Sequence, residues 1–296
     1  MAERLFLFVQ MEFPWELGPA DGRYLLRAGA GEEPERVVIL ETVGATLRRG
    51  RLGARRRPPV EPEPEPTTVP STRATVIDPV SVSAERQARG WLAQMDAERE
   101  ARAAAATLNR LLFAHRIATA DPHVRELSPM QALATRAGWG EGEQVAYGQW
   151  SHARELRFSE HRTRRRSAAL RPQERFAALL GAREAPLLCE EHALRARLDL
   201  DQGRVAHAAL ELEHAYAAAS QELPAQERAD LEARIAELEQ LRPGVLAGAH
   251  AVREGPLAQS GGPDEQTVNH ALTRLEAALR ARTAGAPARP EATPPE

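Results

Sequence analysis

The scarcity of aromatic residues is the feature that most constrains the fold of this chain. Hydrophobic residues make up 43% of the 296 residues but aromatic residues only 4%, so a core must consist mainly of alanine, leucine and valine. Alanine has the highest helix propensity and contributes little buried area, which favours closely packed helices over a thick sandwich of sheets. The chain is long enough for one large domain or two ordinary domains.

The basic residues are unusual, because all 39 of them are arginine. Alanine, glycine and proline are also abundant, and this skew is typical of a GC-rich bacterial genome, so an arginine run carries less functional weight here than elsewhere. With 42 acidic residues the net charge is −3. Because the whole protein is not a polycation, contact with nucleic acid would require a local basic patch.

The cysteine content and the hydropathy pattern indicate a cytoplasmic protein. Cys189 is the single cysteine, which excludes a disulfide or a cysteine-based metal site within one chain. The apolar start of the sequence is interrupted by Gln10 and Glu12, so it is typical of a strand and not of a signal peptide. No apolar run reaches 18 residues, and we therefore expect no membrane association.

The first part of the chain has the pattern of an antiparallel β-meander. Strands are predicted at residues 4–13, 23–28 and 36–43, because apolar residues alternate there between turns rich in Gly, Pro and Asp. A fourth strand is predicted at 71–78. The first strand is apolar on both faces at its start, which indicates a central position in the sheet.

Helical patterns follow the predicted sheet. Apolar residues keep helical spacing from Ala88 to Met95 and again from Leu108 to Leu112. Ser128, Pro129 and Gln131 form a capping-box sequence, which predicts a further helix that begins there and ends at Gly138. The fold class expected for the N-terminal half is therefore α+β, with about four strands and several helices.

The composition divides the chain into successive regions. We expect an α+β domain over 1–150 with a disordered Arg/Pro/Glu-rich insertion at about 48–70, an Arg-rich linker at 151–172, and an all-α domain of helical hairpins over 173–283. The last residues, 284–296, are expected to be disordered.

The all-α domain contains several distinguishable helices. The turn Asp201–Arg204 separates two helices, and another helix is predicted from Ala225 to Leu241. A final helix is predicted from the apolar stripe between Val268 and Leu279.

One stretch of this domain resembles a known repeat. Over about 190–222 a turn glycine is followed by small and apolar residues at the packing positions of a tetratricopeptide-type helical hairpin. The matching residues are Gly203, Ala208, Leu212 and Ala215, with Ala196 in the preceding helix. The resemblance covers about one repeat unit, and it implies protein–protein contact.

Two arginine-rich segments are candidates for contact with nucleic acid or another acidic ligand. The first has six arginines between Arg48 and Arg57; the alternative is a solvated linker. The second combines aromatic rings with arginines; the alternative is that its tryptophans are buried against the sheet. Its candidate residues are Trp139, Tyr147, Trp150, Arg154, Arg157, Arg162, Arg164, Arg165 and Arg166.

No catalytic residue, cofactor or metal ligand is assigned from the sequence. His207 and His214 are seven residues apart, and His192 is expected across the hairpin, but without a third fixed ligand these residues are interpreted as exposed helix histidines. Cys189 precedes two glutamates and is interpreted as a small buried residue. The sequence contains no recognisable dinucleotide, zinc-protease or nucleophile-elbow motif.

The leading hypothesis is a non-enzymatic cytoplasmic adaptor or scaffold. Its helical domain would bind a protein partner or a second copy of the chain through apolar stripes. The expected partner face consists of Leu231, Ile235, Leu238, Leu241, Val268, Leu272, Leu275 and Leu279. One alternative is a nucleic-acid-associated protein that uses the segment 139–166, and a second is an enzyme with an unrecognised site.

Overall fold

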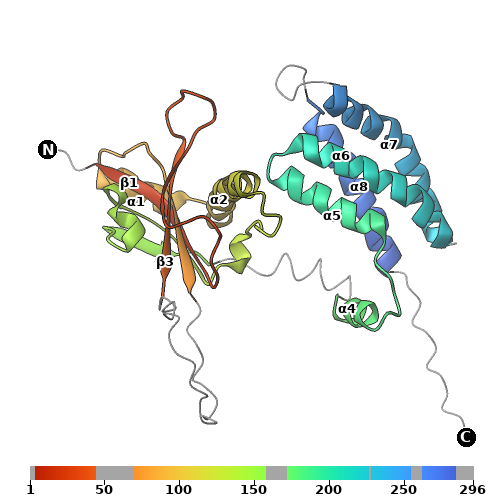
Figure 1. Ribbon diagram of the computed structural model, residues 1–296, viewed down its shortest axis with the longest axis horizontal. Helices are drawn as coiled ribbons and strands as arrows, with labels where there is room; N and C mark the ends of the chain where they lie inside the picture. Colours follow the sequence, from red (N-terminus) through yellow and green to blue (C-terminus); the bar gives the residue numbers. More distant parts are fainter. Residues whose placement is uncertain (1–3, 45–69, 158–171, 227, 255–261, 285–296) are drawn as a thin grey trace, which may run out of the picture. The chain divides into compact units, whose positions relative to one another are not determined.

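The computed structural model describes residues 4–44, 70–157, 172–226, 228–254 and 262–284, which divide into two compact units (Figure 1). The first unit ends at residue 158 and the second begins at residue 159. The first contains an antiparallel sheet with helices and the second is helical, as expected for an α+β chain with a helical C-terminal region. Within the described ranges, no helix combines the length and the hydropathy needed to cross a lipid bilayer.

The first unit contains a six-stranded antiparallel sheet, and four of its strands are those predicted. Its order is β2-β3-β4-β1-β5-β6. The strands are β1 (Leu5–Phe13), β2 (Gly22–Leu26), β3 (Arg36–Val43), β4 (Ser71–Ile77), β5 (Ala134–Glu141) and β6 (His152–Glu155). β2, β3 and β4 form a meander, whereas β1 pairs with β4 and β5 and not with β2. The predicted central position of the first strand is confirmed.

β1 carries apolar residues on both of its faces. This pattern fits its central position in the sheet, because other parts of the unit cover both faces there. Met11 and Phe13 point to a core shared with the helices α1 (Glu85–Gln94) and α2 (Ala97–Thr119). α2 begins at Asp96, whose carboxylate accepts the backbone N–H groups of Glu98 and Arg99. Burial of an alanine and leucine stripe on α2 completes this core.

The opposite face of the sheet is covered by a short 3₁₀ segment, η2 (Gly142–Tyr147). Val145 on this segment packs with Phe8 and Ile39 of the sheet. Gln10 is fully buried beneath it and donates from Nε2 to the Thr75 Oγ1, at 2.9 Å, and to the Ala146 carbonyl, at 3.2 Å. The amide of Gln10 therefore ties η2 to the centre of the sheet.

The prediction of a helix that starts at Pro129 is wrong beyond the first turn. The capping box of Ser128 and Gln131 is present, but it begins a single 3₁₀ turn, η1 (Pro129–Gln131), and the chain then continues as β5. Pairing of β5 with both β1 and β6 outweighs the local helix signal, because a central strand satisfies all of its backbone groups. Gly138, expected at a helix end, lies in the middle of β5.

The Arg-rich linker predicted from residue 151 also needs correction, because its first residues form β6. This strand pairs with β5, so the sheet-containing unit extends past the predicted boundary at 150. The predicted insertion at 48–70 falls almost wholly in 45–69, and the rest of the linker falls in 158–171; both ranges lie outside the described residues.

The second unit is built from helices that pack around an alanine- and leucine-rich core (Figure 1). The helices are α4 (Pro172–Leu180), α5 (Leu188–Asp201), α6 (Val205–Glu222), η3 (Pro224–Gln226), α7 (Ala229–Glu254) and α8 (Glu265–Ala284). The predicted turn between α5 and α6 is confirmed, and Gly203 adopts there a φ of 73°, which a side chain would disfavour. α7 continues past its predicted end and includes Pro243, because Leu238 and Val245 are buried on both sides of the proline.

Two glycine substitutions test the packing of the first unit. A Cβ at Gly138 would lie 2.1 Å from the His152 carbonyl oxygen, whereas a Cβ at Gly90 in α1 would meet nothing within 4 Å. We predict that Gly138→Ala lowers the free energy of unfolding by about 1–3 kcal/mol through overpacking. The matched change Gly90→Ala should raise it by about 0.5–1 kcal/mol, because glycine is unfavourable inside a helix. Urea denaturation of both variants measures this; equal effects would contradict the described contact of β5 with β6.

Candidate functional site

The structure separates the aromatic residues of the predicted nucleic-acid segment. Trp139 is 1% exposed and lies in the core between the sheet and the helices, where its ring packs 4.8 Å from that of His152. Trp150 packs on the opposite face, with its ring centroid 5.7 Å from that of Phe8. The two tryptophans therefore do not form one stacking platform, as the alternative interpretation of buried tryptophans expected.

The remaining candidates of this segment are dispersed. Tyr147, Arg154 and Arg157 are exposed, and Arg154 lines a hollow of about 400 Å³ together with Arg89 and His152. The other candidates lie outside the described residues, as do the arginines of the first segment. These residues are Arg162, Arg164, Arg165 and Arg166, and those from Arg48 to Arg57.

The predicted partner-binding face is not available at the surface of the helical unit. Six of the eight residues are buried in the unit's own core, and the other two are partly buried and pack against it. The buried residues are Leu231, Leu238, Val268, Leu272, Leu275 and Leu279, and the partly buried ones are Ile235 and Leu241. The correction has a simple cause: a four-helix arrangement of α5 to α8 requires one apolar stripe per helix for its own core.

α5 and α6 form an antiparallel hairpin at the position of the tetratricopeptide resemblance, which itself stays a prediction. The two helices pack closely through small residues such as Ala193, Ala196 and Ala208. At the far end of the hairpin, the Glu222 carboxylate accepts the backbone N–H groups of Leu188 at 2.9 Å and Cys189 at 3.0 Å. The carboxylate in the last turn of α6 thus accepts hydrogen bonds from backbone N–H groups in the first turn of α5, which have no partner within their own helix. This contact fixes the register of the two helices.

An ionic network surrounds this end of the hairpin. Glu190 in the first turn of α5 accepts hydrogen bonds from Arg175 of α4 and Arg282 of α8. The side chain of Arg282 is only 11% exposed, and its guanidinium also pairs with Glu184. These contacts connect α4, α5 and α8 through one carboxylate, because guanidinium groups bind carboxylates with several donors.

Cys189 is a structural residue, as predicted. It is fully buried at the start of α5, and burial, followed by the neighbouring Glu222, raises the pKa of its thiol well above its usual range. Glu190 contributes less to this shift than burial does. Because the thiolate is the reactive form of cysteine, this shift disfavours reactivity of Cys189.

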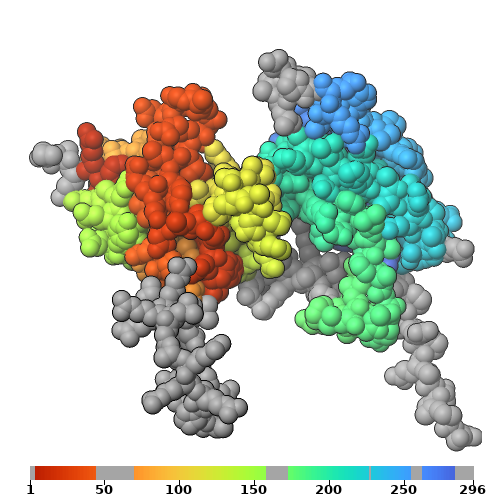
Figure 2. Space-filling view, in the orientation of Figure 1, coloured from red at the N-terminus to blue at the C-terminus, as the bar shows by residue number. Residues whose placement is uncertain are grey.

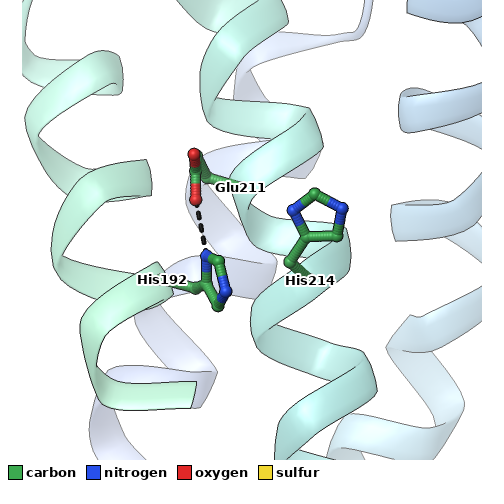
Figure 3. A group of neighbouring side chains, drawn as sticks. All are labelled: His192, Glu211 and His214. Atoms are coloured by element: carbon green, nitrogen blue, oxygen red, sulfur yellow. Dashed lines mark hydrogen bonds and ion pairs between the residues drawn. The ribbon is translucent and has the colours of Figure 1, made fainter. Parts of the chain in front are cut away.

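Three side chains that bear metal-binding atoms lie together on the α5–α6 hairpin. His192 of α5 and Glu211 and His214 of α6 bring one ligand atom each to within 4.8 Å of the others (Figure 3). The Nδ1 of His192 is 2.7 Å from a carboxylate oxygen of Glu211, and the rings of His192 and His214 are 5.3 Å apart between their centroids. His192 and Glu211 are partly buried, whereas His214 is exposed.

Sequence reasoning considered both histidines but missed Glu211. The available signal was the spacing Glu211–His214, since residues three apart on a helix share a face. This spacing alone does not indicate a three-residue cluster. The register of α5 against α6 is also needed, because it places His192 beside Glu211. His207, which the sequence placed with these histidines, is exposed on α6 and does not belong to the cluster described here.

A second feature of α5 is its outward face. Leu194 and Leu198 are four residues apart, and 72% and 46% of their surface is exposed. They lie opposite the buried face formed by Ala193, Ala196 and Leu200. α5 is on the side of the helical unit that faces the viewer in Figures 1 and 2.

Comparisons with protein-family models, curated proteins and solved structures found no match to this chain.

The clamp between Glu222 and α5 predicts a pH-dependent stability. Burial opposes ionisation of Glu222, but the hydrogen bonds from Cys189 and Leu188 and the charge of Arg282 outweigh it and hold its pKa below the ordinary value of 4.5. The stabilisation is therefore complete above about pH 5 and is lost as the pH falls through the lowered pKa. We predict that Glu222→Gln lowers the free energy of unfolding at pH 7 by about 0.5–2 kcal/mol, typical of a helix cap.

Urea denaturation followed by circular dichroism at pH 7, 5 and 3 measures this difference. The effect of Glu222→Gln should shrink below pH 4.5, because the carboxyl of the unfolded chain then binds a proton more readily than the native carboxyl, whose pKa is lowered. The control Glu33→Gln, at an exposed position between β2 and β3, should change stability by less than about 0.5 kcal/mol at each pH. A difference for Glu222→Gln that is the same at all three pH values would contradict a charged clamp.

Proposed function

We propose that this chain is a non-enzymatic adaptor or scaffold protein whose helical unit binds an amphipathic helix of another protein through the outward face of α5. The observation that carries the proposal is the exposed pair Leu194 and Leu198 on a helix whose other side is anchored in the core. Side chains at positions i and i+4 lie on one face of a helix. This is the spacing that a partner helix uses when it packs its apolar residues against such a face.

The charges beside this pair favour docking, because most of them are already neutralised. Arg195 pairs with Glu191, and Arg197 lies 3.9 Å from Asp201, both within α5. Arg197 also pairs with Glu276 of α8 at 2.8 Å. A partner that covers the two leucines would therefore meet a rim of ion pairs and not isolated charges, which reduces the cost of desolvation.

A helix of another protein is favoured over a second copy of this chain. In a twofold antiparallel pairing that places Leu194 against Leu198 of the other copy, residues whose numbers sum to 392 lie opposite each other. Glu191 would then face Asp201, and Arg195 would face Arg197. Although each of these charges is paired within its own chain, like charges at the same level across an interface reduce its electrostatic complementarity, which disfavours pairing of two copies.

α4 presents a second exposed apolar pair with the same spacing. Phe176 and Leu180 are 58% and 72% exposed. α4 is joined to the start of α5 by the hydrogen bonds from Arg175 to Glu190. This contact holds the second pair on the same unit as the α5 face, which supports a role in binding.

The experiment is affinity capture from an extract of the source cells with the intact chain as bait. A captured protein is identified, purified and titrated by calorimetry against the intact chain and against the double variant Leu194→Glu/Leu198→Glu. We predict that the double variant weakens binding by about 30-fold or more, as expected for the loss of a central apolar anchor. The matched control Leu246→Glu, an exposed leucine on α7, should leave the affinity unchanged.

Light scattering of the intact chain completes the test. We expect a monomer at micromolar concentration. A dimer that the double variant dissociates would show that a second copy occupies the face, and equal binding of the captured partner to all variants would exclude this face as its site.

A further inference from the structure

We propose that His192, Glu211 and His214 form a binding site for one divalent transition-metal ion of the Zn²⁺ type, which bridges α5 and α6. The inference is independent of the proposed partner face. The leucines of that face point away from the bundle, whereas His192 lies on the side of α5 next to α6.

The donor atoms fit this class of ion. Two imidazole nitrogens and one carboxylate oxygen are ligands that Zn²⁺ and neighbouring divalent ions accept. The set contains too few oxygen atoms for Ca²⁺ or Mg²⁺, which prefer six or more oxygen ligands or several retained waters. It also contains no sulfur, since Cys189 is fully buried at the start of α5.

The distances require only small side-chain movements. Ligands about 2.0–2.1 Å from a tetrahedral ion are separated from one another by roughly 3.3 Å. The candidate ligand atoms lie within 4.8 Å of one another, and the shortest described separation, from His192 to Glu211, is 2.7 Å. His214 is exposed, so its ring can turn towards the other two ligands without displacing core residues.

The backbone beneath the cluster is held in place from both ends of the hairpin. Glu222 fixes the first turn of α5, and Arg204 bonds Asp199 at 2.6 Å beside the connecting turn. Glu211 and His214 share one helix, so their spacing does not change. The helix positions are thus fixed independently of a metal, which reduces the ordering cost of binding.

The electrostatic surroundings do not oppose a cation. Arg195, one turn along α5 from His192, forms an ion pair with Glu191, which offsets its charge. Glu211 supplies a carboxylate at the site itself, and one of its oxygens lies 2.7 Å from the Nδ1 of His192, within hydrogen-bond distance. The exposed side of His214 leaves room for water as a fourth ligand.

The alternative is an ordinary surface His–Glu pair, and the chain offers a matched example. His250 and Glu254 on α7 approach to 3.3 Å and are both exposed. They do not belong to a described group of three ligands. The variant His250→Ala is therefore a control for binding to any exposed histidine beside a carboxylate.

The test is isothermal titration of Zn²⁺ into the intact, chelator-treated chain, with Mg²⁺ as the comparison ion. We expect one Zn²⁺ per chain with micromolar or tighter affinity and no displacement by millimolar Mg²⁺. Each of His192→Ala, Glu211→Gln and His214→Ala should weaken binding by about 100-fold, since even groups outside the ligand shell change affinity by about 10- to 100-fold. His250→Ala should leave it unchanged.

Circular dichroism confirms that each variant remains folded, because all three residues lie on the rim of the hairpin and outside its core. The proposal is overturned if the intact chain binds no Zn²⁺ at micromolar concentration. It is also overturned if any one of the three ligand variants binds as tightly as the intact chain, or if His250→Ala loses binding to the same extent.

Discussion

Alanine at the contacts between helices is the constraint on which the rest of the structure depends. With few aromatic residues available, the core can be filled only if the helices approach closely, and small side chains permit this approach. In the helical unit Ala193 and Ala196 of α5 face α6, whose Ala208 and Ala215 are equally buried. The narrow spacing brings the rims of the two helices together, and the cluster of His192 with Glu211 and His214 is a consequence of it.

The first unit also has few aromatic residues for its core, and it contains a strand that is buried on both sides. β1 lies between β4 and β5, and its alternate residues supply the core beneath the helices and the smaller core beneath η2. The amide nitrogen of a buried polar residue in this strand, Gln10, donates hydrogen bonds to Thr75 and to η2. Two of the large aromatic residues, Phe8 and Trp139, are buried in these two cores and not at a ligand surface.

Local sequence patterns predicted the helices and strands whose structure depends on their own side chains. They failed for elements whose structure depends on contacts with residues far away in the sequence. The four strands up to Ile77 and the stripe of α8 follow from hydrophobic periodicity. β5 carries a capping box just before it and glycines within it, so its strand character depends on partners more than 100 residues away in β1. The leucines of α7 and α8 were identified as an apolar face, but the sequence does not say whether such a face is covered by its own bundle or by another chain. Glu211 was missed for the same reason, because helix register determines its neighbour.

X-ray absorption at the zinc edge is the most direct test of the zinc site proposed on the α5–α6 hairpin. The sample is the intact protein with one equivalent of Zn²⁺. The predicted first shell contains only nitrogen and oxygen at about 2.0–2.1 Å, with the multiple-scattering signature of two imidazole rings. A sulfur ligand at about 2.3 Å, or a shell without two imidazoles, would contradict the site formed by His192, Glu211 and His214.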